Sequence, residues 1–177
     1  MNAFEFPVGI CLLGLLAVAA GSDLHSRRIP NWLVVTGLTL ALATQWSLHG
    51  AARGASFWTL GVLTGGGLFL PLYLLRGMGA GDVKLMAMVG AFVGPELALQ
   101  IVLVTCVIGG VWALAAIVFR RALKSAGNNM LAIALSRGGF ESGKRAALTS
   151  VGALPYGVAI AMGTLSIMIL RAGQSVV

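Results

Sequence analysis

The stretch RGMGAGDVKLMAMVGAFVG, residues 76–94, opens as a glycine-rich turn and continues as an apolar segment typical of a membrane helix. Two charged residues, Asp82 and Lys84, stand where the turn gives way to that segment. The chain has only five acidic residues among its 177. A charged side chain is costly to keep at the edge of a hydrocarbon layer. The position of Asp82 therefore requires an explanation.

Composition identifies the class of protein. The chain is 58% hydrophobic and 10% charged, with a mean hydropathy of +0.95, whereas a soluble domain is about 45–50% apolar and about 25% charged. The apolar residues form six runs, at 6–22, 31–49, 55–75, 82–94, 97–119 and 151–170. About 20 helical residues cross a hydrocarbon layer of about 30 Å, so the short run 82–94 must begin in the preceding loop, tilt or lie inside the bundle. The sequence predicts an all-α polytopic membrane protein with six transmembrane helices in a single domain, 1–177.

The basic residues indicate which way the chain crosses the membrane. Two of the twelve, Arg53 and Arg171, flank one side of the predicted bundle. The other ten flank the opposite side: Arg27, Arg28, Arg76, Lys84, Arg120, Arg121, Lys124, Arg137, Lys144 and Arg145. Basic residues accumulate on the cytoplasmic side, so both termini are predicted to lie outside. The net charge of +7 then reflects topology and contact with anionic membrane lipid, and no nucleic-acid partner is expected.

The longest polar connection, residues 120–150, is predicted to be a cytoplasmic loop. Its middle, NNMLAIALS at 128–136, has the pattern of one short amphipathic helix lying on the membrane surface. Cys11 and Cys106 stand alone in apolar runs without any Cys-x-x-Cys pair. No zinc knuckle or disulfide framework is therefore predicted, and we expect neither a metal nor a cofactor.

The five acidic residues divide into two groups. Glu5, Glu96 and Glu141 stand at water-accessible ends of the apolar runs, where a solvated charge is expected. Asp23 ends the first predicted helix and Asp82 starts the fourth, which places both at the cytoplasmic boundary. Two carboxyl groups from separate helices at one depth can meet. We therefore identify Asp23 and Asp82 as a candidate functional pair.

Each aspartate taken alone also has a structural explanation. Asp82 could be a helix cap or a first-turn acid that the helix dipole favours. Asp23 could pair with Arg27 or Arg28 in the short connection that follows it. These two arginines could instead set the orientation of the chain, or tune the aspartate pair.

The glycines before Asp82 weaken its explanation as a simple cap. Gly77, Gly79 and Gly81 are more glycines than a cap requires, and they allow a positive φ or the close approach of another segment. Lys84 either anchors the helix at the membrane surface or helps to hold Asp82 ionised. The sequence leaves both roles of Lys84 open.

Four further residues form a supporting set. Pro30 suits the first turn of the second helix, with Asn31 beside it. Pro155 is placed to kink the last helix near the site, with Tyr156 lining it. The glycines at 65–67 favour close packing between helices over the binding of a ligand.

Three motifs resemble those of a known family. GAGD at 79–82 resembles the Gly-x-Gly-Asp motif of intramembrane aspartyl proteases. SDLHSRRIPN at 22–31 resembles the first-aspartate segment of the type IV prepilin peptidases, and LPYGVAIAMG at 154–163 is similar to the Pro-Tyr/Phe-Gly segment of that family's last helix. The match covers nearly the whole chain in the same order. The length, and the lack of a domain with paired Cys-x-x-Cys motifs, resemble the small form found with tight-adherence (Flp) pilus systems.

The resemblance implies an aspartic endopeptidase of the bacterial inner membrane. Its substrates would be prepilins or pseudopilins, cut at the cytoplasmic surface in association with the pilus assembly machinery. Asp23 and Asp82 would share one proton, one activating water and the other polarising the scissile carbonyl, without a metal. Which aspartate carries the proton stays open. N-methylation of the product is not expected, because the domain linked to it is missing from this sequence.

Two alternatives belong to other functional classes. A small ion- or proton-coupled transporter could use the same two aspartates as a relay. Transporter sites lie near the membrane midplane in folds built from repeats, whereas here both aspartates are at one edge and no repeat is visible. A non-catalytic assembly protein with a degenerate site is the third possibility, and the intact motifs argue against it.

Overall fold

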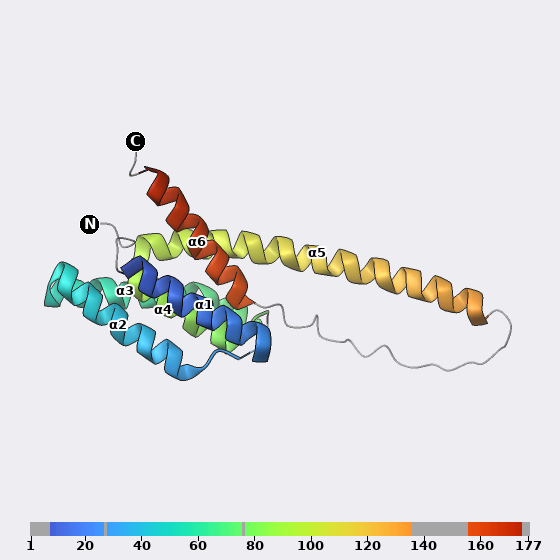
Figure 1. The fold of residues 1–177 in the computed structure, drawn as a ribbon, viewed down its shortest axis with the longest axis horizontal. Coiled ribbons are helices and arrows are strands. Elements are labelled where there is room, and N and C mark those ends of the chain that lie inside the picture. The colour runs from blue at the N-terminus through green and yellow to red at the C-terminus, as the bar shows by residue number, and fades with distance from the viewer. Residues whose placement is uncertain (1–7, 27, 76, 136–155, 175–177) are drawn as a thin grey trace. The chain divides into compact units, whose positions relative to one another are not determined.

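The regular structure of the described residues is entirely helical, which confirms the predicted fold class for that part of the chain. The computed structural model describes residues 8–26, 28–75, 77–135 and 156–174. Its helices are α1 (Val8–Ser26), α2 (Asn31–His49), α3 (Ala51–Leu74), α4 (Ala80–Val93), α5 (Pro95–Leu135) and α6 (Tyr156–Gln174) (Figure 1).

The largest departure from the sequence prediction concerns α5. This helix runs without a break to Leu135, so residues 120–135 continue it where a loop and a separate short helix at 128–136 were expected. The physical reason lies in the composition of residues 120–126, which are mostly strong helix formers such as Arg, Ala, Leu and Lys. The remainder of the predicted loop, 136–150, lies outside the described residues.

Contacts gather in two compact units. The first comprises Met1–Gly109 with Pro155–Val177, and the second comprises Gly110–Leu154. Both aspartates belong to the first unit. The organisation of the site can therefore be followed within that unit alone.

Four helices are long and apolar enough to cross a membrane: α1, α3, the part of α5 from Pro95 to Ala115, and α6. Helix α4 has 14 residues and is about 21 Å long, which is shorter than the hydrocarbon layer. It contacts α1, α2, α3 and α6. Of the three possibilities for the short apolar run, the structure shows the one in which α4 lies inside the bundle.

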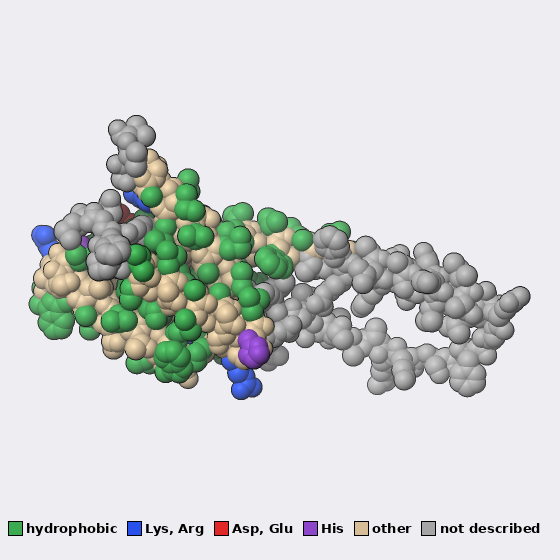
Figure 2. Space-filling view, viewed as in Figure 1, with side chains coloured by type: hydrophobic (Ala, Val, Ile, Leu, Met, Phe, Trp, Pro, Cys, Tyr) green, Lys and Arg blue, Asp and Glu red, His purple; other side chains and the backbone are tan. Residues whose placement is uncertain are grey.

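The surface of the described helices is apolar. Large hydrophobic side chains stand exposed on every helix except α4, among them Leu24 at 66%, Trp32 at 65% and Leu63 at 65%. Figure 2 shows such side chains spread across the visible face of these helices. An apolar surface this extensive fits contact with lipid.

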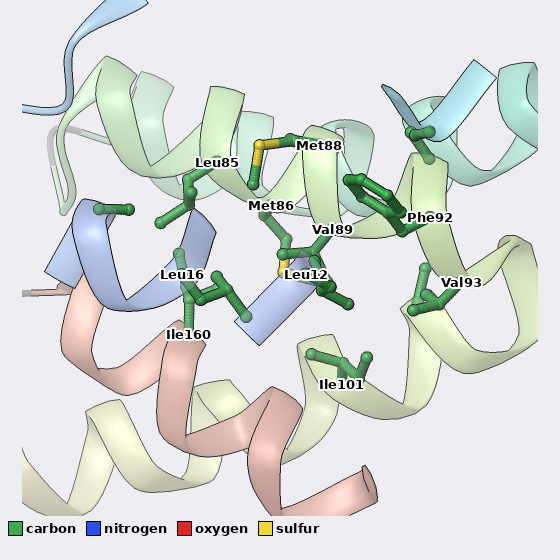
Figure 3. Close-up of a cluster of buried hydrophobic side chains, with 14 of the residues drawn as sticks. Leu12, Leu16, Leu85, Met86, Met88, Val89, Phe92, Val93, Ile101 and Ile160 are labelled. Carbon is green, nitrogen blue, oxygen red and sulfur yellow. The ribbon is translucent and has the colours of Figure 1, made fainter. Parts of the chain in front are cut away.

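The core forms around α4. Leu85, Met86, Met88, Val89 and Phe92 are each no more than 1% exposed. They meet side chains from α1, α5 and α6 (Figure 3). Burial on all sides explains why the run 82–94 is apolar without a polar face.

Glycines let α3 and α4 approach until their backbones touch. A Cβ on Gly61 would overlap the carbonyl oxygen of Gly90, and a Cβ on Gly90 would overlap that of Gly61. Gly65 meets the carbonyl of Met86 in the same way. The close packing predicted for 65–67 therefore holds at Gly65 and Gly66, while a Cβ on Gly67 would meet nothing within 4 Å.

The α3–α4 contact yields a stability prediction. Gly90→Ala should lower the free energy of unfolding by about 1–3 kcal/mol, because the added methyl group forces the two backbones apart. Gly67→Ala is the matched control, since its methyl group points into open space and removes flexibility from the unfolded chain. Thermal unfolding in detergent, followed by circular dichroism, compares them. Equal stability of the two variants would show that the contact does not constrain α3 and α4.

Candidate active site

Asp23 lies in the last turns of α1 and is 8% exposed. Its Oδ2 accepts a hydrogen bond of 3.0 Å from the backbone N–H of Gly157, the second residue of α6. The first N–H groups of a helix have no partner within the helix and carry its positive end. The start of α6 therefore supplies a backbone donor to the Asp23 carboxyl group.

Gly157 is required for this contact. A Cβ at that position would lie 2.8 Å from Oδ2 of Asp23 and 3.1 Å from its Cβ. Any other residue would push the carboxyl group away from the N–H that binds it. The sequence analysis did not include Gly157 among the site residues, although the Pro-Tyr-Gly segment at 155–157 was the signal that could have identified it.

Asp82 occupies the third position of α4 and is 7% exposed. Its Oδ2 accepts a hydrogen bond of 3.1 Å from the backbone N–H of Gly79, the N-cap residue. Its own backbone N–H donates to the carbonyl of Gly79 at 3.1 Å. Asp82 is therefore a first-turn acid that closes the start of α4, as one of the sequence alternatives proposed.

The glycines before Asp82 allow another segment of the chain to approach closely. Positive φ angles occur in the described part of the chain at Gly50 and Gly94, so Gly77, Gly79 and Gly81 adopt ordinary conformations. A Cβ on Gly81 would lie 3.3 Å from Cβ of Ile29. The connection between α1 and α2 thus packs directly on the turn that carries Asp82.

Asp23 and Asp82 lie close together. Helices α1, α4 and α6 contact one another pairwise, and Coulombic repulsion from Asp23 acts on the Asp82 carboxyl group. Two carboxyl groups that are near one another repel when both are charged. A pair of this kind is the arrangement that general acid–base chemistry on water uses.

Lys84 contacts Asn31. Its Nζ donates a hydrogen bond of 3.0 Å to Oδ1 of Asn31, and both residues are exposed. This bond ties the first turns of α4 to the start of α2. Pro30 precedes α2 as its N-cap, with φ −67° and ψ 134°, and so stands one residue before the first turn in which the sequence analysis placed it.

Of the other predicted supporting residues, the structure describes Arg28 and Tyr156. Arg28 is exposed, and its carbonyl accepts a 2.8 Å hydrogen bond from Oγ of Ser22. Tyr156 begins α6 and is half-buried, with Cε1 3.2 Å from where a Cβ on Gly109 would be. Arg27 and Pro155 lie outside the described residues, so their roles stay predictions.

The part of the chain that the structure describes contains no cluster of potential metal ligands. No group of three or more His, Cys, Asp or Glu side chains there is placed to hold an ion. The acid–base groups that the described site offers are the carboxyls of Asp23 and Asp82.

Comparisons with known proteins agree with the motifs. The model of the type IV leader peptidase family matches residues 10–114, which is more than half of the chain. A similar relative is a "Prepilin leader peptidase/N-methyltransferase" of Xanthomonas campestris pv. campestris, 34% identical over 112 residues. The match covers 58% of this chain and 37% of the relative, so the chain corresponds to little more than a third of that protein. No solved structure matches.

The hydrogen bond between Asp23 and the start of α6 can be tested through the stability of the protein. Gly157→Ala should lower the free energy of unfolding by about 1–3 kcal/mol, because the methyl group displaces a buried carboxyl from its hydrogen bond. Gly173→Ala, on the same helix with nothing within 4 Å of an added Cβ, should stay within about 0.5 kcal/mol of wild type. Chemical denaturation in detergent micelles measures both. A Gly157→Ala variant as stable as Gly173→Ala would argue against the contact.

Proposed function

The chain belongs to the type IV leader peptidase family, and on that premise we propose that it is an aspartic endopeptidase that removes the leader of a prepilin or pseudopilin. The observation that carries the proposal is the pair of buried carboxyls, Asp23 and Asp82, which lie close together where α1, α4 and α6 meet. Both are residues of the motifs that resemble the family's catalytic segments.

The reaction follows from the chemistry of a carboxyl pair. The ionised carboxylate takes a proton from a water molecule while the water oxygen attacks the scissile carbonyl carbon. The protonated partner donates its proton to the carbonyl oxygen, which would otherwise carry the developing negative charge. As the C–N bond breaks, the protonated carboxyl gives its proton to the leaving nitrogen, and the ionised carboxylate takes a proton from a hydroxyl group of the tetrahedral intermediate, which becomes the new carboxyl group. The pair therefore begins and ends with one proton, and titrates as a unit.

The site and the substrate would meet at the membrane surface. A prepilin would present a leader in the cytoplasm and an apolar helix in the bilayer, so the bond between them lies at the boundary. We propose that the chain passes six times between the two faces of the inner membrane, with the short helix α4 making its passage inside the bundle, and that both termini lie outside. This arrangement would put Asp23 and Asp82 at the cytoplasmic boundary. Lipid and the pilus assembly machinery would be its other partners.

Replacement of either aspartate tests the reaction. Asp23→Asn and Asp82→Asn should each reduce leader cleavage by at least about 100-fold, because an amide cannot accept the proton from water or share the proton of the pair. The double variant should be no worse than either single one, since the two groups act as a unit. Cleavage is measured by intact mass of a prepilin co-expressed from the same genome.

The matched control is Glu96→Gln, which makes the same kind of change at an exposed carboxyl in the first turn of α5. It should cleave at nearly the wild-type rate. Processing at the wild-type level by either asparagine variant would refute the aspartate mechanism and leave Asp82 as a helix cap.

Orientation is tested separately. A reporter that is active only in the cytoplasm should work when it is inserted in the 120–150 segment and fail when it follows Arg171. The expectation rests on the asymmetry of the basic residues, ten on one side against two on the other. The reverse pattern would place the aspartates on the side away from the leader, which is incompatible with the proposed reaction.

A further inference from the structure

The proposed mechanism gives no role to Gln45, a buried polar side chain. Gln45 lies in α2 and is 2% exposed. Its Nε2 donates a hydrogen bond of 2.7 Å to the carbonyl oxygen of Phe92 and one of 3.4 Å to that of Ala91. Both carbonyls belong to the last turn of α4, at the opposite end of that helix from Asp82.

The end of α4 creates the need for this donor. The chain turns at Gly94, which has a φ of +79°, and α5 begins at Pro95. The carbonyl of Ala91 would be bonded by the N–H four residues later if the helix continued, but that residue is Pro95, which has no N–H. A buried carbonyl without a donor destabilises the fold. The amide of Gln45 supplies the donor from another helix.

The gain in stability from this donor is partly offset. The Oε1 atom of Gln45 is buried and accepts no hydrogen bond from any group that the structure describes, and burial of an unsatisfied polar atom costs free energy. An apolar side chain of similar size would avoid that cost but would leave the carbonyls of Ala91 and Phe92 without the Gln45 donor. The directional bonds also hold the end of α4 in one place, which an apolar side chain could not do.

Three contacts set the position of α4. The backbones of α3 and α4 touch at Gly61 and Gly90, and a Cβ on Gly54 of α3 would overlap the backbone carbonyl of Gln45. These packing contacts fix the distance between the helices, whereas the directional bond from Gln45 fixes α4 along its own axis. Asp82 stands ten residues from Phe92, about 15 Å along a helix. A shift at one end is therefore transmitted to the other.

We propose that Gln45 is a positioning residue that fixes the axial position of α4, and through it the position of Asp82 relative to Asp23. The proposal rests on the proposed function only in treating Asp82 as a catalytic residue. It makes two separable statements: that Gln45 holds the first turn of α4 in place, and that this placement matters for cleavage.

A cross-link measures the first statement without any cleavage assay. Cβ of Ile29 lies 3.3 Å from where a Cβ on Gly81 would be, close to the separation of about 3.5–4.5 Å in a disulfide. The pair Ile29→Cys and Gly81→Cys is introduced after Cys11→Ala and Cys106→Ala remove the two native thiols. The rate of disulfide formation under mild oxidant then reports where the first turn of α4 lies against the α1–α2 connection.

Gln45→Met is the test variant, because it keeps the volume of the side chain and removes the donor. It should slow cross-linking severalfold and, in the enzyme without the added cysteines, lower kcat about tenfold or more with KM within twofold of wild type. Gln45→Asn, which keeps the amide but is one methylene shorter, should also slow cross-linking and lower kcat. Thr44→Val is the matched control, since the Thr44 hydroxyl donates within α2, to the carbonyls of Leu40 and Ala41. This variant should leave the cross-linking rate and kcat unchanged.

The outcomes separate the two proposals. Wild-type rates of cross-linking in both Gln45 variants would overturn the positioning role, whether or not cleavage changes. Slower cross-linking with unchanged kcat would also overturn it, because the placement of α4 would then not govern Asp82. If the wild-type protein cleaves no prepilin, the proposed function fails, and the cross-linking rate still decides whether Gln45 holds α4.

Discussion

Two carboxyl groups are buried where α1, α4 and α6 meet, and the surrounding structure compensates for the cost of their burial. Each accepts a hydrogen bond from a backbone N–H at a helix start, Asp23 from Gly157 and Asp82 from Gly79. Backbone donors at helix N-termini favour negative charge without adding a basic side chain that would neutralise it. In the proposed reaction, these backbone donors would hold both carboxyl groups in place in a partly dry site while the pair acts on water.

The short central helix α4 makes that arrangement possible. It is too short to cross a hydrocarbon layer by itself, and it is buried against four other helices. Close contact at Gly61 and Gly90 brings its backbone against that of α3, and such close packing of backbones is a main source of helix association in lipid. A helix packed in this way can hold Asp82 at a defined position below the surface.

The first turn of α4 combines structural contacts with a candidate catalytic residue. Asp82 closes this turn by accepting the bond from Gly79, and a carboxyl in that role can also belong to the proposed pair, so the structural and functional explanations of the residue are compatible. Lys84 bonds to Asn31 and joins α4 to α2, and its predicted roles, as a membrane anchor or in holding Asp82 ionised, stay predictions. The same turn therefore carries both these contacts and the proposed chemistry.

The sequence by itself determined the helical class and the positions of most helices, and it singled out the two aspartates as candidates. Apolar runs and glycine-rich turns are local patterns, and they predicted the bounds of α2 and the start of α4 closely. It did not determine that α5 continues to Leu135, because helix propensity over residues 120–126 competed there with a polar composition typical of loops. Only the tertiary structure decided that Gly157 binds Asp23 and that Gln45 bonds the end of α4. These contacts join residues 134 and 47 positions apart, and no local pattern encodes which distant backbone group a buried side chain will reach.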